Sequence, residues 1–411
     1  MNMDQLVRDA LHEQAADATT APPDFANRVL AARRRRRNGT FAGAALATAV
    51  AVAVGVAVPA MNDGRDQPQL ASQADGSDII AHPDQTPPRD LIAAGNTALA
   101  AYYTQATVKE TADRGVSRRT YHLLNQKTGK YVKTTKWSFL DVAPGMRTAA
   151  VLEQDLPAKR IGLLNLLTGE VERWIPVDHA VAGVEFSPDG SKLVATTYSK
   201  NPDLRLRADY DADGDGKKND WMPDMSNSAR TGFYVLDVGS GDGSWNEVEV
   251  PSAEGGFGVD INARQDFGFS QDGKLVYSGL TSAPHMQYYD FKGNEVGKPA
   301  NEKHLHWAVE AGLSPDGKLA AGDFAGGAKT TASWINDPYS GKHLHRIRGQ
   351  QLLAWVDNKR LIAWDIEKGA NEFHNGLVLV TIGSDKTVPL SGSRKGNDGA
   401  DGRWTPIFAA R

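Results

Sequence analysis

The chain of 411 residues contains no cysteine, which excludes disulfide bonds, thiol catalysis and zinc sites with cysteine ligands. The same absence excludes a lipid-modified N-terminal cysteine, and it fits a compartment in which free thiols would be a liability. Positive charge is also scarce after residue 61, where 39 Lys and Arg residues face 45 Asp and Glu residues. This mildly acidic body argues against a nucleic-acid partner, because such binding requires a basic surface.

Sequence signatures of common enzyme classes are missing as well. The chain has no glycine-rich phosphate loop and no His-Glu-x-x-His zinc motif. Two near-matches to the Gly-x-Ser-x-Gly nucleophile elbow, residues 268–272 and 312–316, end in Asp and belong to a repeated turn. These absences favour a binding protein over an enzyme.

One long hydrophobic run lies near the N-terminus. Residues 41–61 carry no charge and, as a helix, would span about 31 Å, the thickness of a bilayer core. Arginines at 33–37 precede the run, so the positive-inside rule places the N-terminus in the cytoplasm and the remainder outside. The sequence predicts a cytoplasmic helical segment at 1–38 and one transmembrane helix at 39–61. A signal peptide cleaved near Pro59 is the alternative.

The composition changes twice beyond this run. Residues 62–92 are polar and contain prolines at 68, 83, 87 and 88, which is typical of a linker without a core of its own. Residues 93–411 contain short apolar or alternating runs separated by glycine-containing turns, with no long amphipathic helix pattern. This second pattern predicts an all-β domain.

A nearly identical turn recurs along the β-rich region. It reads FSPDGSKLVA at 186–195, FSQDGKLVYS at 269–278 and LSPDGKLAAG at 313–322. Ser, Pro and Asp suit the first three positions of a type I turn, and Gly accepts a left-handed fourth position, for which Asn is the next best residue. The turn markers, spaced by 45, 83, 44 and 41 residues, are Gly145, Gly190, Gly273, Gly317 and Asn358. A period of about 40–45 residues is typical of one four-stranded propeller blade.

The longest spacing, 83 residues, indicates a blade with an insert, residues 200–230, between strands B and C of the third blade. The first blade has segments for strands B, C and D at 98–110, 118–126 and 130–136, but none for strand A. The apolar segment 404–408 can supply that strand, which would close the ring and hide two sheet edges. We therefore expect a six-bladed β-propeller, with seven blades as the alternative.

These SPDGKLxA units resemble the WD40-like repeats of TolB-type β-propellers, and the resemblance covers residues 93–411. They differ from true WD40 repeats, which end in Trp-Asp after strand C, because Trp364–Asp365 lies shortly after an A–B turn. With the cytoplasmic segment, the single span and the polar stalk, the layout is similar to membrane-anchored propeller proteins of high-GC Gram-positive bacteria. For that group the resemblance implies no defined activity.

The insert contains an aspartate-rich segment, DYDADGDGKKND, at residues 209–220. Carboxylates at alternate positions before a glycine allow one short loop to wrap a hard cation, as calcium loops do. The preferred register uses as ligands Asp211, Asp213, Asp215 and Asn219. The other register runs from Asp209 to Asp220 and places Lys217 at the ninth position. A solvated acidic loop that binds nothing specifically is the alternative to a calcium site.

Histidines are the other candidate ligands. Those expected on the same face as the insert are His179, His285, His304 and His306. Imidazole is a common metal ligand, but these residues come from different predicted blades, so ordinary polar packing is favoured over a shared metal cluster. His343 and His345, on an outer strand, are expected to be structural.

The sequence as a whole predicts an extracytoplasmic, membrane-tethered propeller that acts as a binding or scaffolding module. We expect its loop face, which carries the insert, to contact an envelope protein or a glycan, with calcium ordering the insert. One alternative is a metal-dependent propeller enzyme resembling lactonases or lyases. Another is a transmembrane regulator that senses outside and signals through residues 1–37.

Overall fold

Short strands separated by tight turns make up the regular structure of the described part of the chain. The computed structural model describes residues 79–209, 218–224, 228–248, 264–280, 285–327, 331–394 and 403–411. Over these residues the chain is an all-β protein, and none of them forms a helix long and apolar enough to cross a membrane. The predicted cytoplasmic segment 1–38 and transmembrane helix 39–61 lie outside the described residues.

The first sheet joins the two ends of the β-rich region. Four of its strands, in sheet order, are β26 (Trp404–Ala410), β3 (Thr97–Lys109), β4 (Arg114–Asn125) and β5 (Lys130–Thr134). β26 runs antiparallel to β3, with Trp404 opposite Thr104 and Ala410 opposite Thr97. This ladder confirms the predicted pairing of the C-terminal segment with the first repeat unit. It also covers a sheet edge that would otherwise be open to strand addition.

The second sheet has seven strands and covers two repeat units. In order of pairing they are β6 (Trp137–Val142), β7 (Thr148–Glu153), β8 (Ala158–Asn165), β9 (Glu170–Phe186), β10 (Lys192–Tyr198), β13 (Arg230–Asp237) and β14 (Gly243–Glu247). The first part of β9, up to Pro176, pairs with β8, and its last part, from Val181, pairs with β10. One continuous strand therefore ends one unit and begins the next.

Three smaller sheets follow. The first contains β15 (Phe267–Phe269), β16 (Val276–Gly279), β17 (Met286–Tyr289) and β18 (Glu295–Val296). The second contains β19 (Ala320–Phe324), β20 (Ser333–Asn336) and β21 (His343–Ile347). The third contains β22 (Gln351–Trp355), β23 (Arg360–Ile366), β24 (Asn375–Thr381) and β25 (Thr387–Pro389).

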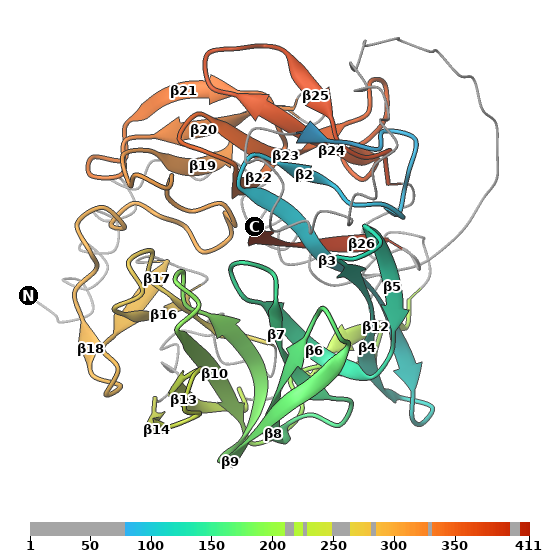
Figure 1. The fold of residues 1–411 in the computed structure, drawn as a ribbon, viewed down its shortest axis with the longest axis vertical. Coiled ribbons are helices and arrows are strands. Elements are labelled where there is room, and N and C mark those ends of the chain that lie inside the picture. Colours follow the sequence, from blue (N-terminus) through green and yellow to red (C-terminus); the bar gives the residue numbers. More distant parts are fainter. Residues whose placement is uncertain are drawn as a thin grey trace, which may run out of the picture.

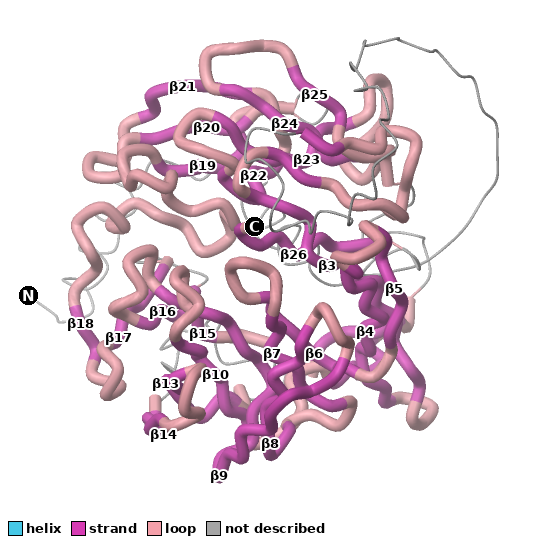
Figure 2. The backbone as a smooth tube through the Cα atoms, viewed as in Figure 1, coloured by secondary structure: helices cyan, strands magenta, loops and turns pink. Residues whose placement is uncertain are grey.

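The sheets are arranged around a common middle, as in a β-propeller. In Figure 1 they follow one another in chain order, from β3–β5 through β6–β10 and β16–β18 to the orange strands β19–β25. Figure 2 shows the same ring of strands, with the C-terminal strand β26 returning beside β3. The described residues therefore form separate antiparallel sheets that follow one another in a propeller-like arrangement.

The repeated turn has the geometry that its residues predict. The marker glycines with left-handed φ angles of 81°, 72°, 67° and 69° are Gly145, Gly190, Gly273 and Gly317. In the turn before β10, the Ser187 hydroxyl donates to Asp189 Oδ1 at 2.6 Å. Hydrogen bonds from Ser187 and Ser191 lower the pKa of Asp189 to about 2, so this turn is closed by an ionised side chain.

The expectation of a left-handed Asn358 is wrong. Asn358 does not have a positive φ angle, and its Oδ1 accepts a hydrogen bond from Asp316 N in the neighbouring turn at 3.0 Å. The turn is closed by Asp357 instead, whose Oδ1 accepts from the N–H groups of Lys359 and Arg360 at 2.8 and 2.9 Å. A carboxylate that caps two donors removes the need for a left-handed residue.

The predicted linker ends earlier than residue 92. β1 (Ile79–Ile80) pairs with β2 (Ala93–Ala94), and β2 pairs with β3, so residues 79–94 extend the first sheet. Ile92 is fully buried, and its carbonyl accepts a hydrogen bond from Leu99 N at 2.9 Å. The adjacent Leu91 and Ile92 are buried, whereas Ile79 stays exposed, so this pair supplies the apolar surface that holds the segment on the sheet.

The described strands of the insert between β10 and β13 do not pair with the strands of the unit that the insert interrupts. It contains β11 (Leu204–Ala208) and β12 (Asp220–Pro223), which pair as a hairpin. β11 also pairs with β4 of the first sheet, with Leu204 opposite Val116. The segment that separates β10 from β13 therefore crosses to a different sheet.

Carboxylates connect the first strands of successive units. Asp141 Oδ2 on β6 accepts a hydrogen bond from Phe186 N on β9 at 2.8 Å. Glu185 Oε1 on β9 accepts one from Phe269 N on β15 at 2.9 Å. Burial raises the pKa of Asp141 to about 6, even though this hydrogen bond favours its ionised form. These contacts fix the positions of three neighbouring strands around the middle of the molecule.

Closure of the ring by β26 can be tested at Trp404, which is 1% exposed and donates its indole N–H to Thr86 Oγ1 at 3.2 Å. We expect Trp404→Ala to lower the free energy of unfolding by about 3–5 kcal/mol, because it empties a large core position. Urea unfolding of the full chain, followed by circular dichroism, measures the change. In the control Tyr339→Ala, the lost side chain is 60% exposed, and we expect a change below about 0.5 kcal/mol. Equal losses in the two variants would contradict the closing role of β26.

Candidate functional site

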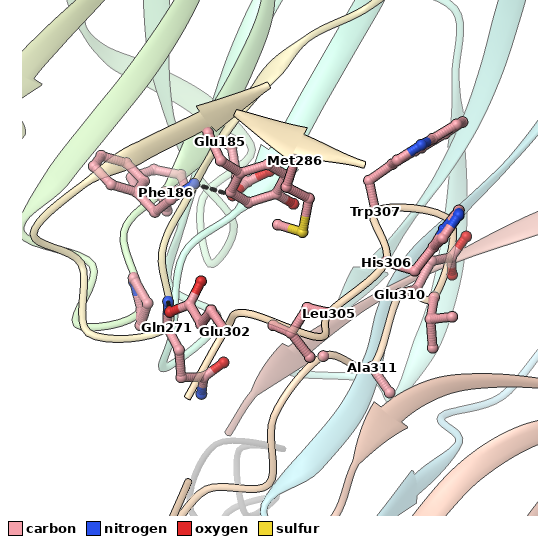
Figure 3. A pocket seen from close by; sticks show the side chains of 15 residues that line it. Glu185, Phe186, Gln271, Met286, Glu302, Leu305, His306, Trp307, Glu310 and Ala311 are labelled. Atoms are coloured by element: carbon pink, nitrogen blue, oxygen red, sulfur yellow. Dashed lines mark hydrogen bonds between the residues drawn. The ribbon is translucent and has the colours of Figure 1, made fainter. Parts of the chain in front are cut away.

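A pocket of about 390 Å³ lies between β9, the sheet of β15–β17 and the connection from β18 to β19. The labelled side chains surround an open space in Figure 3. Its apolar and aromatic wall includes Phe186, Phe269, Tyr277, Met286, Leu305 and Trp307. Its carboxylates are Glu185, Glu302 and Glu310, and none of the lining residues that the structure describes is Lys or Arg.

Glu185 is positioned by the strand beside it. Its Oε1 atom accepts the hydrogen bond from Phe269 N, which holds the carboxylate against β15. A Cβ atom at Gly268 would lie 3.0 Å from both carboxylate oxygens and 2.9 Å from Tyr277 Cζ. Only glycine therefore allows Glu185 and Tyr277 to approach this strand so closely.

Glu302 forms the buried side of the pocket. It is 2% exposed, and its two oxygens accept hydrogen bonds from Gln271 N at 2.8 Å and from Tyr288 OH at 2.7 Å. Burial raises the pKa of Glu302, and burial together with the adjacent Glu302 raises the pKa of Tyr288. The low polarity of this side makes any further negative charge costly.

The opposite wall comes from the connection between β18 and β19. Trp307 Nε1 donates to Leu280 O at 2.6 Å, which fixes the indole beside the pocket. His306 Nδ1 accepts from Ala308 N at 3.1 Å, which orients the imidazole ring at this wall. Glu310 is exposed at the same wall, which leaves its carboxylate accessible from solvent.

Only two of the four candidate histidines come together. The rings of His285 and His306 lie 4.5 Å apart, and burial lowers the pKa of both. His179 instead stacks on Trp245 with ring centroids 3.6 Å apart, and His304 is exposed. Among the residues that the structure describes, no group of three or more His, Asp or Glu side chains is arranged to hold a metal ion. The convergence required by a metal-dependent enzyme is therefore not found there.

His343 and His345, which we expect to be structural, both lie on β21, an edge strand of its sheet. His343 on β21 stacks on Trp334 with ring centroids 4.4 Å apart, and its Nδ1 lies 2.8 Å from Asn336 Oδ1. His345 is exposed on the same strand, opposite Ile335 of β20. Neither residue lines the pocket.

The aspartate-rich segment is described only at its base. Asp211, Asp213 and Asp215 lie outside the described residues, whereas Asp209, Asn219 and Asp220 flank the β11–β12 hairpin. Asp209 Oδ1 lies 3.6 Å from Lys218 Nζ. Asn219 has a left-handed φ of 86°, and its carbonyl accepts a hydrogen bond from Arg207. Asp220 lies opposite Ala208 in the hairpin. The described ends of the aspartate-rich segment thus lie at the turn end of one hairpin, where β11 leads into β12.

A buried ionic cluster anchors the insert, and sequence analysis missed it. Asp203, which is 2% exposed, accepts hydrogen bonds from Arg119 Nη1 at 2.8 Å and from Arg264 Nη2 at 2.6 Å. The two guanidinium groups come from β4 and from the residues just before β15. Arg119 lies in a polar stretch of β4, RGVSRRTYHLLN, so its burial gave no clear signal in the sequence.

The same cluster is enclosed by aromatic rings. The guanidinium carbons of Arg119 and Arg264 lie 5.4 Å and 4.4 Å from the centroid of the Phe139 ring. Arg264 also pairs with Asp266 at 3.0 Å. Burial opposes ionisation of Asp203, but the charges of both arginines hold its pKa well below the usual range. The base of the insert is therefore a desolvated ionic joint between sheets.

No known protein family and no curated protein matches the sequence. Among solved structures, the chain is similar to TolB from Acinetobacter baumannii, with 14% identity and a TM-score of 0.35 over 71% of this chain and 67% of that chain. It is similar to the β-propeller domain of Cps50 (Swd1) from Myceliophteria thermophila, with 12% identity and a TM-score of 0.36 over 72% and 88%. It also resembles hydrazine synthase from Kuenenia stuttgartiensis, with 13% identity, a TM-score of 0.32 and 62% of this chain covered. The match spans 65% of that synthase, less than two thirds of its length.

The ionic joint can be tested with Asp203→Asn, which leaves two buried guanidinium groups without their shared counter-charge. We expect the free energy of unfolding to fall by about 3–5 kcal/mol at neutral pH. Because the folded pKa of Asp203 is depressed, its contribution is present above about pH 4 and is lost as the pH falls through the folded pKa. Urea unfolding at several pH values measures both effects.

The matched control for this joint is Asp155→Asn. Asp155 lies 3.6 Å from Arg118, but its side chain is 98% exposed, so we expect a loss of at most about 1 kcal/mol. A loss at Asp203 no larger than that at Asp155 would show that the buried cluster does not stabilise the fold.

Proposed function

We propose that the chain is a six-bladed β-propeller, held outside the cell by its N-terminal span, that binds a ligand rather than transforming one. The first sheet and the three small sheets supply one unit each, and the seven-stranded sheet supplies two. The tether follows from the uncharged run 41–61 and the arginines at 33–37. Binding and scaffolding are favoured because the described residues hold a pocket but no cluster of metal ligands.

The observation that carries the binding role is the composition of the pocket. Its three carboxylates share one cavity with aromatic rings and with no described Lys or Arg. Carboxylates that face the same cavity disfavour one another's ionisation, and a cation placed between them relieves that cost. Aromatic faces also attract cations. We therefore propose that the pocket accepts an ammonium or guanidinium group, presented by a basic side chain of an envelope protein or by a glycan that carries amino groups.

Calcium belongs to this proposal as the ion that orders the insert. The donor set is the one the sequence provides, from Asp209 to Asp220. Its described ends meet at the turn end of the β11–β12 hairpin. A hairpin brings the two ends of a loop together, which suits a compact oxygen cage for a hard cation. The ion would then stiffen a loop that the buried Asp203 already attaches to the first sheet.

The pocket can be tested with small cations that mimic the proposed groups. We expect Nα-acetyl-lysine methylamide or its arginine analogue to bind the full chain at least about tenfold more tightly than the neutral norleucine analogue, a difference of about 1.4 kcal/mol. Glucosamine distinguishes an amino sugar from a basic side chain as the preferred source. Isothermal titration calorimetry measures each affinity.

The variant for this test is Glu310→Gln, because Glu310 is exposed at the pocket wall and its loss leaves the buried side intact. We expect it to weaken cation binding about three- to tenfold and to leave binding of the norleucine analogue unchanged. Glu170→Gln, at the exposed first residue of β9 and outside the pocket, is the control and should change neither. Equal binding of the lysine and norleucine analogues would contradict a cation pocket.

The calcium site can be tested by the melting temperature of the full chain. We expect millimolar CaCl₂ to raise it relative to MgCl₂, because Mg²⁺ resists dehydration in a flexible oxygen cage. The triple variant Asp211→Asn, Asp213→Asn and Asp215→Asn should abolish the calcium effect. A calcium-dependent shift that survives in this variant, or none in the unmodified chain, would exclude the site.

A further inference from the structure

Arg230 opens β13 and lies between two sheets. It is opposite Tyr198 of β10 and is 4% exposed. Its Nη1 atom donates to Ser278 Oγ on β16 at 2.6 Å and to Gln265 O, just before β15, at 3.0 Å. Its guanidinium carbon lies 4.3 Å from the centroid of the Phe267 ring. These contacts fix the guanidinium group in place and prevent it from turning towards another partner.

The remaining edge of this guanidinium group has no acceptor among the residues that the structure describes. Its Nε and Nη2 atoms are buried without a hydrogen-bond partner. In arginine these two atoms carry parallel N–H bonds, which match the two oxygens of a carboxylate. Burial lowers the pKa of Arg230, because a desolvated cation without a counter-charge is unfavourable. The cost is a reason to expect an anion at this edge.

Two other largely buried arginines use the same edge within the chain. Arg264 donates from Nε and Nη2 to the two oxygens of Asp203 at 3.2 and 2.6 Å. Arg394 donates from Nε and Nη2 to Asn375 Oδ1 at 2.9 and 2.7 Å. In Arg264 and Arg394 an acceptor from the chain therefore satisfies the Nε and Nη2 donors. In Arg230 the same two atoms have no acceptor among the described residues.

The acidic residue closest in the sequence to this site is already engaged. Asp266 Oδ1 accepts from Tyr198 OH at 3.0 Å, and Asp266 Oδ2 accepts from Arg264 Nη1 at 3.0 Å. In the described parts of the chain, no carboxylate forms an ion pair with Arg230. An acceptor for the open edge must therefore be supplied by another group.

We propose that the Nε–Nη2 edge of Arg230 is a binding site for a small carboxylate anion. The two oxygens of the anion accept the parallel N–H bonds, while Ser278 and the Gln265 carbonyl keep the guanidinium group oriented. The site lies between β13 and the sheet of β15–β17, and Arg230 does not line the acidic pocket. It would stabilise the contact between these two sheets, because the anion binds the folded state only.

The test uses the full chain and acetate or formate as the probe. The melting temperature is measured in sodium acetate, sodium formate and sodium chloride at equal ionic strength. We expect acetate and formate to raise it by several degrees over chloride, with a concentration dependence that saturates. The shift should disappear in Arg230→Gln and should weaken in Arg230→Lys, which keeps the charge but lacks the parallel donors. Arg346→Gln, at an exposed arginine on β21, is the control and should keep the full shift.

A second measurement keeps the test valid if Arg230→Gln does not fold. In the unmodified chain with ¹⁵N-labelled arginine, the Nε–H resonance of Arg230, assigned with Arg230→Lys, should move on addition of acetate and saturate over the same range. A resonance that is insensitive to acetate, or equal melting temperatures in acetate and chloride, overturns the proposal. That result would mean that water or an acceptor from the chain itself fills the edge.

Discussion

The ladder between β26 and β3 is the interaction on which the remaining structure depends. A ring of sheets closes most stably when its first and last units share strands, because each open edge exposes unpaired backbone groups. Here the last strand of the chain pairs with the first long strand over its whole length, from Trp404 to Ala410. Closure then places the first strand of each unit next to that of the following unit. In that arrangement the carboxylate of Glu185 on β9 accepts a hydrogen bond from the backbone N–H of Phe269 on β15.

The sequence predicts the local geometry and the closure because both depend on few residues. The four residues of a Ser-Pro-Asp-Gly turn determine its conformation locally, and the marker glycines have the left-handed φ angles expected of them. Closure of the ring could be predicted because the first unit lacks a segment for its strand A and the apolar segment 404–408 can supply that strand. The departures are also local: Asp357 caps its turn with a side chain and leaves Asn358 without a left-handed role. Residues 79–92 join the first sheet because β1 pairs with β2 and because Leu91 and Ile92 are buried, a pair too short to change the average composition of this polar segment.

The pocket and the ionic joint could not be predicted in the same way, because each depends on distances between sheets. Glu185 is more than 100 residues away from Glu302 and Glu310, and nothing in the sequence shows that the three share a cavity. Asp203 looked like an ordinary polar residue of an insert, yet it lies between arginines from two distant strands. Histidine spacing was equally uninformative. Of four candidates, His285 and His306 meet, while His179 stacks on a tryptophan.

The insert combines two parts with different physical demands. Its beginning is a desolvated joint, where Asp203 neutralises two guanidinium groups that would otherwise be buried without a counter-charge. Further along, the hairpin of β11 and β12 lies on β4, and the guanidinium carbon of Arg207 lies 4.2 Å from the centroid of the Trp221 ring. The aspartate-rich segment is therefore attached to the first sheet rather than to β10, from which it departs. This attachment rests on the buried Asp203 and on the pairing of β11 with β4, both of which lie outside residues 210–217.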